Sequence, residues 1–255
     1  MAGTDKSHLV ENGGASDTLS LAVILVEPQM GENIGMASRA MLNCGLTDLR
    51  LVRPRDGWPN SKANSSASGA DVVVDGARVF DTTTEAIADL SVVYAATARP
   101  RDMIKTVMTP RHGVPQLRKE ADVGQACGVL FGGERAGLEN ADVALADVVL
   151  QAPLNPGFRS LNLGHAVMMV CYEWYQTGSE APAEFLPEGR TRQATKGELV
   201  NFFERLESAL DDSGFLHVLE KRPVMVRNIR NIFQRAQLTE QELRTLHGIV
   251  SALRP

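Results

Sequence analysis

The sequence is poor in cysteine and lacks any cluster of metal-binding residue types. Its three cysteines, Cys44, Cys127 and Cys171, lie far apart among 255 residues and form neither a CxxC pair nor a group with histidine. Zinc sites need close spacings of such residues, so we expect no bound metal. Each cysteine stands in an apolar stretch, which predicts three buried thiols in a reducing compartment.

Long apolar runs are also absent. None approaches the roughly 20 residues that a membrane-spanning helix requires, and residues 1–18 contain no hydrophobic stretch typical of a signal peptide. We therefore expect a cytoplasmic protein with no membrane partner, in which residues 1–18 form a disordered tail. The net charge of −5 provides no general basic field that would attract nucleic acids.

Three fingerprints of common α/β enzymes are missing as well. The first apolar run, Leu19–Val26, is not followed by GxGxxG, so the dinucleotide-binding signature is absent. Neither the GxxxxGK[ST] loop of P-loop NTPases nor the GxSxG elbow of α/β-hydrolases occurs. These absences argue against an oxidoreductase on a dinucleotide-binding sheet and against the other two enzyme classes.

Apolar runs and helical periodicity alternate over residues 19–176. Strands are predicted at Leu19–Val26, Leu49–Val52, Val92–Ala96, Val129–Phe131 and Asp147–Leu150, with short candidates at Val72–Val74 and Arg78–Phe80. Helices are predicted at residues 33–45, 61–69, 82–90, 113–121 and 161–175. This alternation indicates an α/β domain with a mostly parallel sheet and helices on both faces.

The pattern changes after this domain. Residues 177–194 carry two prolines, two glycines and five charges, a composition typical of a linker. Residues 195–255 show only helical periodicity, and Thr195 with Glu198 and Thr239 with Glu242 have the spacing of capping boxes. We therefore predict a small all-helical C-terminal extension.

The candidate site lies in the stretch from Gly128 to Val167. One predicted strand stops at Gly132-Gly133 and the next stops at Ala152-Pro153. Parallel strands that end in such loops form a ligand crevice at one edge of the sheet. The polar residues on these loops are Glu134, Arg135, Asn155, Arg159, Ser160 and Asn162.

Three segments, taken in order, resemble the motifs of a known family. They are NIG at residues 33–35 with Arg39, FGGERAGL at 131–138, and Asn155-Pro156 followed by SLNL at 160–163. They resemble the SPOUT superfamily of RNA 2′-O-ribose methyltransferases, and most closely its bacterial TrmJ-type tRNA enzymes. The resemblance covers about residues 20–175, and residues 195–255 resemble the C-terminal extension of the same enzymes.

This resemblance implies a fold and an activity. The sheet would end in a deep trefoil knot, S-adenosylmethionine would bind in the knotted loops, and the enzyme would be a homodimer with composite active sites. The substrate would be the ribose of cytidine or uridine 32 in the tRNA anticodon loop. Methylation of ribosomal RNA or of another tRNA position is the near alternative. A non-catalytic knotted RNA-binding module is the alternative from another class.

The resemblance also assigns roles to individual residues. The cofactor residues would be Ala96, Thr97, Ala98, Gly132, Gly133, Ala152, Asn155, Arg159, Ser160 and Leu161. The catalytic residues would be Arg39, Glu134, Ser160 and Asn162. Many relatives carry a small residue where Arg159 stands, which leaves contact with the RNA backbone or with solvent open for this guanidinium.

Arg39 would occupy the catalytic arginine position. A free guanidinium has a pKa above about 12 and is a poor base. Arg39 is therefore either strongly perturbed by a substrate phosphate, or it orients that phosphate and stabilises the developing alkoxide. We favour the second role.

Two segments are rich in positive charge although the net charge of the chain is negative. Residues 99–119 are rich in arginine and lysine, and residues 221–235 hold five basic residues and no acidic one. Basic stripes beside an active site are typical of RNA-binding proteins, although a solvated charged face is the alternative for the second segment. The predicted substrate-binding residues are Asn33, Arg99, Arg101, Arg227, Arg230 and Arg235. The helical extension is accordingly predicted to bind tRNA.

The helix predicted at residues 161–175 suggests how two copies could associate. Its apolar residues Leu163, Val167, Val170 and Trp174 are more numerous than one sheet face requires. We therefore expect this helix to be buried in a two-fold homodimer.

Overall fold

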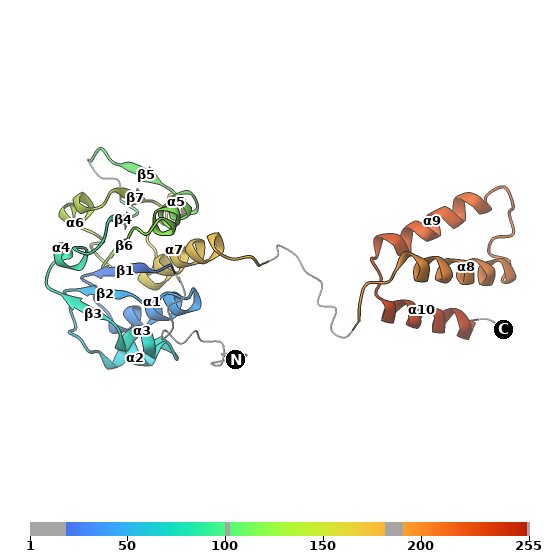
Figure 1. Cartoon of the computed structure of the whole chain (residues 1–255), viewed down its shortest axis with the longest axis horizontal. Coiled ribbons are helices and arrows are strands. Elements are labelled where there is room, and N and C mark those ends of the chain that lie inside the picture. Colours follow the sequence, from blue (N-terminus) through green and yellow to red (C-terminus); the bar gives the residue numbers. More distant parts are fainter. Residues whose placement is uncertain (1–18, 100–102, 182–190, 254–255) are drawn as a thin grey trace. The chain divides into compact units, whose positions relative to one another are not determined.

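A seven-stranded sheet lies at the centre of this computed structural model, which describes residues 19–99, 103–181 and 191–253. The strands are β1 (Leu21–Val26), β2 (Leu49–Val52), β3 (Arg78–Phe80), β4 (Val92–Ala96), β5 (Thr106–Met108), β6 (Cys127–Gly132) and β7 (Val148–Leu150). Their order is β3-β2-β1-β6-β4-β7-β5, and all neighbouring strands run parallel (Figure 1). The predicted parallel α/β sheet is confirmed.

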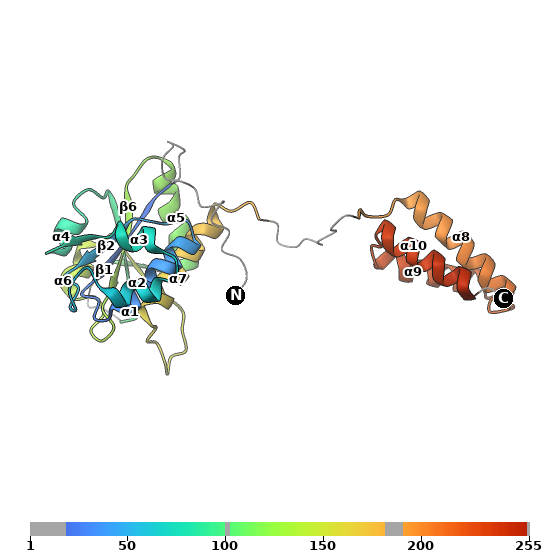
Figure 2. The same cartoon turned by 90° about the horizontal axis from the view of Figure 1, so that it is seen from below.

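Helices cover both faces of this sheet, as predicted. They are α1 (Gly31–Asn43), α2 (Ser61–Ala67), α3 (Asp71–Asp75), α4 (Thr83–Ala86), α5 (Pro110–Asp122), α6 (Asn140–Leu145) and α7 (Leu163–Thr177). One face packs against α1, α5 and α7, and the other packs against α4 and α6. Figure 2 shows α4 and α6 on the opposite side of the sheet from α5 and α7.

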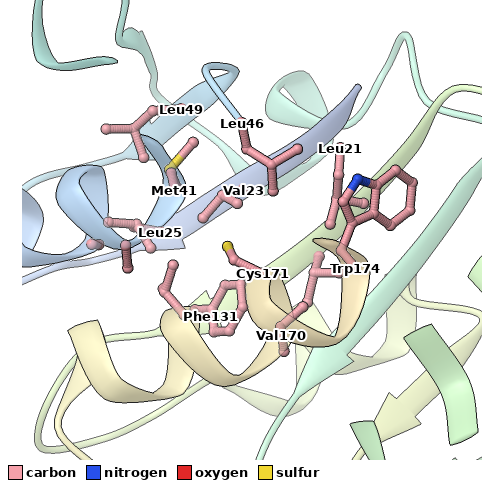
Figure 3. Packing of buried hydrophobic residues seen from close by; sticks show 14 of the residues in the cluster. Leu21, Val23, Leu25, Met41, Leu46, Leu49, Phe131, Val170, Cys171 and Trp174 are labelled. Atoms are coloured by element: carbon pink, nitrogen blue, oxygen red, sulfur yellow. The ribbon is translucent and has the colours of Figure 1, made fainter. Parts of the chain in front are cut away.

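β1 is buried on both faces and organises the core. Leu21, Val23 and Leu25 pack toward α1 and α7 (Figure 3), whereas the three intervening residues pack toward α4 and α6. Trp174 of α7 packs in the same cluster as Leu21 and is 2% exposed. Because burial of a large apolar side chain contributes about 1.5–3 kcal/mol, this cluster fixes α7 against the sheet.

The segment Val72–Val74 was predicted as a strand and is instead part of helix α3. Val73 and Val74 are buried, whereas Val72 is 53% exposed. The helix packs against α1 and α2 rather than joining the sheet. A run of β-branched residues favours a strand by propensity, but here the packing of adjacent side chains against two helices decides the conformation.

Several element boundaries also differ from the prediction. The predicted helix 82–90 is confined to Thr83–Ala86, where the Thr82 side chain accepts a hydrogen bond from the Glu85 amide at 3.1 Å. The helix predicted from residue 113 begins at Pro110, because proline suits the first turn of a helix. β5 and α6 occupy segments for which no element was predicted. Both are too short to show a clear periodicity.

Helix α7 contradicts the reasoning behind the predicted dimer. Leu163, Val167, Val170 and Trp174 are at most 4% exposed and belong to the core beneath the sheet. They are therefore not a surface for a second copy. The prediction counted the apolar residues correctly, but it underestimated how much of this helix the sheet, α1 and α5 cover.

The C-terminal unit is a separate bundle of three helices, α8 (Lys196–Asp212), α9 (Arg222–Arg235) and α10 (Glu240–Leu253). Both predicted capping boxes are present: the Glu198 amide donates to Thr195 Oγ1 and the Glu242 amide to Thr239 Oγ1, each at 3.3 Å. A small core of Leu199, Phe202, Phe203, Leu243 and Val250 joins α8 to α10, and α9 contributes no fully buried residue.

The boundary between the two compact units falls between Glu180 and Ala181, inside the predicted linker. Residues 1–18 and half of that linker, residues 182–190, lie outside the described residues. All three cysteines are free and buried, as predicted, and burial raises the pKa of the Cys127 thiol to about 11. Across residues 19–99, 103–181 and 191–253, no helix has the length and apolarity to cross a membrane, and no three His, Cys, Asp or Glu side chains gather as metal ligands would.

Candidate active site

A cavity of about 450 Å³ opens at the carboxyl ends of β4, β6 and β7. Its walls are the loops that follow these strands and the first turns of α7. Carboxyl ends of parallel strands are the usual ligand site of open α/β sheets. The crevice predicted from the sequence is therefore present at the predicted edge.

All but one of the predicted cofactor residues line this cavity. They are Ala96, Thr97, Ala98, Gly132, Gly133, Ala152, Arg159, Ser160 and Leu161. The exception is Asn155, whose side-chain oxygen accepts a hydrogen bond from the Gly157 amide at 3.0 Å. Asn155 thus shapes the loop between β7 and α7 in this structure.

Gly132 and Gly133 are required by close approaches within the protein. A Cβ atom at Gly132 would lie 2.0 Å from the backbone carbon of Gly137, and one at Gly133 would lie 2.3 Å from the carbonyl oxygen of Glu27. No side chain fits at either position. The two glycines therefore let the loop after β6 fold tightly beside the cavity.

The side chain of Asn33 connects the three signature segments. Its Nδ2 donates to Glu134 Oε1 at 2.6 Å, and its Oδ1 accepts from Asn162 Nδ2 at 2.8 Å. Asn33 is only 4% exposed, so a missing partner would be costly here. A single buried amide therefore holds α1, the loop after β6 and the start of α7 in one arrangement.

Glu134 and Asn162 each make a second hydrogen bond that extends this network. Glu134 Oε2 accepts from the Gln29 amide at 2.8 Å, which fixes the turn between β1 and α1. Asn162 Oδ1 accepts from the Gly164 amide at 2.9 Å and caps the N-terminus of α7. Through these bonds, Glu134 anchors the loop after β6 to α1 and to the turn that precedes it.

Arg39 is placed differently from the other predicted catalytic residues. It lies exposed on α1, and its side chain makes no hydrogen bond or ion pair with the described part of the chain. It does not line the cavity, whereas Ser160 does. Neither Ser160 nor Asn162 contacts Arg39 through a hydrogen bond among these residues. Arg39 is thus not part of the cavity formed by its own chain.

The predicted substrate-binding residues fall into different environments. Arg99 stands at the rim of the cavity, where its Nη2 donates to the Arg135 carbonyl at 3.1 Å. Arg101 lies outside the described residues. Arg227 and Arg235 are exposed on α9 with no ion pair in the described part of the chain.

Arg230, by contrast, contacts other side chains of the helical unit. Its Nε pairs with Glu207 Oε1 at 2.6 Å, and its guanidinium lies 5.5 Å from the centre of the Phe203 ring. Hydrogen bonding to Glu207 raises the pKa of Arg230. These contacts attach α9 to α8, so Arg230 has a structural role that the basic pattern of the helix does not reveal.

The prediction missed the apolar residues of the cavity. Pro110, Leu138, Leu154, Ala166 and Met169 also line it. Leu138 belongs to a signature segment and could have been included. The others come from helices or a loop without a distinctive motif, and only the tertiary fold brings them to this wall.

Comparison with known protein families matches both units of the chain. The profile of the SpoU rRNA Methylase family matches residues 20–172, and that of the C-terminal domain of the tRNA methyltransferase TrmJ matches residues 197–254. The tRNA (cytidine/uridine/adenosine-2′-O-)-methyltransferase TrmJ of Pseudomonas aeruginosa (strain UCBPP-PA14) is 34% identical over 239 residues, which cover 91% of this chain and 92% of that relative.

Solved structures give the same result. The crystal structure of TrmJ from Z. mobilis ZM4 is 46% identical, with a TM-score of 0.80, and the match covers 92% of this chain and 99% of that chain. The SpoU methyltransferase AviRb from Streptomyces viridochromogenes, in complex with AdoMet, shares the fold at 20% identity and a TM-score of 0.51, over 62% of this chain and 57% of that chain. The chain therefore belongs to the SpoU methylase family, and within it to the TrmJ proteins.

Proposed function

We propose that this chain transfers a methyl group from S-adenosylmethionine to a ribose 2′-hydroxyl of tRNA, at cytidine or uridine 32 of the anticodon loop. The observation that carries the proposal is the Asn33 network, which assembles all three signature segments beside one cavity. The Pseudomonas aeruginosa relative is named for 2′-O-methylation of tRNA nucleosides. AviRb, which has the same fold, was crystallised with AdoMet.

The cavity suits this cofactor in size and lining. Its volume of about 450 Å³ lies in the range of small-molecule sites. Small residues such as Ala96, Ala98 and Gly132 leave backbone groups accessible for hydrogen bonds to an adenine, while Leu138 and Met169 supply apolar surface. When bound, the cofactor supplies an electrophilic methyl group on a sulfonium.

The residues of the chain would act by positioning and by electrostatics. Alignment of the ribose oxygen with the methyl group and sulfur can contribute several kcal/mol. The loops after β6 and β7 are fixed through Glu134 and Asn162, so a substrate held by them would be held rigidly. Arg39 would orient a substrate phosphate and stabilise negative charge on the attacking oxygen.

The separation of Arg39 from the cavity of its own chain supports a composite site. We infer that the Arg39 of a second copy completes each cavity, as the family resemblance implies. Sedimentation at micromolar concentration should then give a dimer. A monomer that methylates tRNA at the full rate would contradict this arrangement.

Two further features belong to the proposal. The chain would pass through a deep trefoil knot formed around β6, β7 and α7, the elements that enclose the cavity. The helical unit would bind tRNA away from the target nucleotide, because Arg227 and Arg235 are exposed and carry no internal partner among the described residues. Each is supported by the family match, with residues 197–254 matching the TrmJ C-terminal domain.

A transfer assay tests the proposed function directly. The protein is incubated with tritium-labelled cofactor and with tRNA from cells that lack the modification, and the labelled nucleotide is mapped after digestion. Label in the ribose of nucleotide 32 is expected. Label in ribosomal RNA alone, or in another tRNA position, would replace the substrate. Cofactor binding without transfer to any RNA would indicate a non-catalytic RNA-binding protein.

A further inference from the structure

A second cavity of about 320 Å³ adjoins the first at the same edge of the sheet. The two share Ala98, Ala152, Leu154 and Arg159. The second cavity extends toward β5, the edge strand, and it is otherwise lined by Val107, Met108, Thr109, Gln151 and Pro153. Its volume is in the range of a small-molecule site, so the crevice has room for a ligand beside the cofactor.

The polar groups of this second cavity favour an anionic ligand. Among the described residues that line it, none is acidic and three have side chains that carry hydrogen-bond donors. Thr109 precedes α5 without a side-chain cap hydrogen bond, and Gln151 Nε2 donates to the Ala98 carbonyl at 3.3 Å. Arg159 makes no hydrogen bond or ion pair within residues 19–99, 103–181 and 191–253. A guanidinium that the fold does not use is suited to bind a phosphate.

The remaining wall is apolar. Val107, Met108, Pro153 and Leu154 line it, and Val107 is 56% exposed although it belongs to a strand. The loop between β7 and α7, which carries Arg159, projects from the first unit at the bottom of Figure 2. An apolar wall beside a cation that has no partner in the described part of the chain matches a nucleotide, which has an apolar base and a charged phosphate.

We propose that the second cavity binds the RNA nucleotide adjacent to the methylated one, with its phosphate on Arg159. This inference rests on the proposed function. A strand whose target ribose enters the first cavity must continue past it, and Arg159 lies on the boundary of the two cavities. The other anion available there is the carboxylate of the cofactor, and the experiment separates these two ligands.

Substitutions that change one charge test the proposal in the full-length protein. Arg159→Gln removes the cation, and Lys62→Gln on the exposed surface of α2 is the matched control. We expect Arg159→Gln to weaken the binding of unmodified tRNA about 10-fold and to lower the salt slope by about one unit. Its affinity for S-adenosylmethionine, measured by calorimetry, should stay within about twofold of the wild type, and Lys62→Gln should change neither quantity.

A second pair of variants probes the cavity without touching Arg159. Thr109 lines the second cavity but not the first, and it is exposed. Thr109→Glu places a carboxylate there, whereas Thr109→Gln adds similar bulk without charge. We expect the glutamate variant to bind tRNA more weakly than the glutamine variant, and both to bind the cofactor equally.

Each other outcome overturns the proposal. Loss of cofactor affinity in Arg159→Gln with unchanged tRNA affinity would assign the second cavity to the carboxylate of the cofactor. Unchanged binding of both ligands in Arg159→Gln and Thr109→Glu would leave Arg159 as a solvent-exposed residue. Failure of the proposed function is distinguishable, because it would appear as absence of methyl transfer by the wild-type protein.

Discussion

Asn33 is the residue on which the three signature segments depend. Asn33→Ala would remove one hydrogen-bond partner from the Glu134 carboxylate and one from the Asn162 amide, in a partly buried setting. We expect a loss of about 1–3 kcal/mol in the free energy of unfolding, measured by urea titration, together with reduced methyl transfer. Ser38→Ala is the control, because Ser38 is equally buried on α1 but its hydroxyl donates to the Ile34 carbonyl within the same helix. Equal effects of the two changes would contradict this role.

Arg39, in contrast to Asn33, should be needed for methyl transfer but not for stability. It is exposed and unpaired within the described part of the chain, so Arg39→Ala should change the stability by less than about 0.5 kcal/mol. It should leave the affinity for S-adenosylmethionine within a few-fold, because Arg39 does not line the cavity. Methyl transfer should be abolished. Turnover at the wild-type rate in this variant would remove Arg39 from the mechanism.

For single residues, the sequence predicts which ones surround the cavity better than it predicts their hydrogen-bond and ion-pair partners. Polar and glycine residues in the loops after β6 and β7 were identified because the ends of parallel strands meet at one edge. The bonds of Asn33 and Arg230 could not be identified, since each depends on which element packs beside it. Arg230 of α9, for example, pairs with Glu207 of α8, and only the packing of these two helices brings the residues together.

Among the elements, β2 carries a buried charge, the guanidinium of Arg50. Arg50 is 2% exposed and donates to the Ala86 carbonyl at 2.7 Å and to Asp48 at 2.9 Å, as well as to Asp89. Burial by itself would raise the pKa of Asp48, but hydrogen bonds from Arg50 and Arg78 outweigh it and hold that pKa below its usual range. The hydrogen bond from Arg50 also lowers the pKa of Asp89.

These shifts predict how stability depends on pH. A carboxyl group with a lowered pKa in the folded state stabilises the fold above its unfolded pKa of about 3.9, and this contribution is lost as the pH falls through the folded value. The free energy of unfolding should therefore decrease below about pH 4. In Arg50→Met the decrease should be shallower, because Asp48 and Asp89 lose the partner that lowers their pKa values.

The same variant should be less stable near pH 7. The loss should be smaller than the about 3–5 kcal/mol typical of fully buried ion pairs, because the side chains of Asp48 and Asp89 are 24% and 57% exposed. Arg53→Met removes an exposed pair with Glu27 and serves as the control. Chemical denaturation between pH 2 and pH 7 measures both effects. Parallel pH profiles for wild type and Arg50→Met would exclude this account.

The strands were predictable where every residue of a segment is buried, because such a segment is a nearly continuous apolar run in the sequence. The run at β1 is buried on both faces, and the alternation of strands and helices gave the parallel sheet. Prediction was wrong for Val72–Val74, where packing against helices outweighs strand propensity. It missed β5, a three-residue edge strand whose pairing with β7 is visible only in the folded chain.

For the whole molecule, the composition of the surface matters more than the net charge. The chain is acidic, with a formal charge of −5, but Arg99, Arg159, Arg227 and Arg235 are exposed beside the cavities or on α9. Under the proposed function, these local groups of cations would provide the phosphate contacts that the net charge of the chain does not suggest. The proposed dimer would have to form through surfaces other than the apolar residues of α7, which are buried in the core of one chain.

The two compact units lead to a prediction about truncation. A chain ending at Gly178 keeps every residue that lines the cavity. It should bind S-adenosylmethionine as the full chain does, measured by calorimetry, but should lose most of its tRNA affinity and activity. Efficient methylation of tRNA by the truncated chain would show that the helical unit has a structural role only.

Substitutions on α9 should separate RNA contact from folding within that unit. The paired change Arg227→Gln and Arg235→Gln removes exposed cations without internal partners among the described residues, so it should lower the salt slope of tRNA binding by about two units and leave thermal unfolding unchanged. Arg230→Gln breaks the pair with Glu207 and the contact with Phe203. Because those contacts hold α9 on α8, this variant should destabilise the helices, with a smaller change in the salt slope. If Arg230→Gln instead lowers the slope as much as either exposed arginine and leaves the helices equally stable, then α9 binds RNA through a different face.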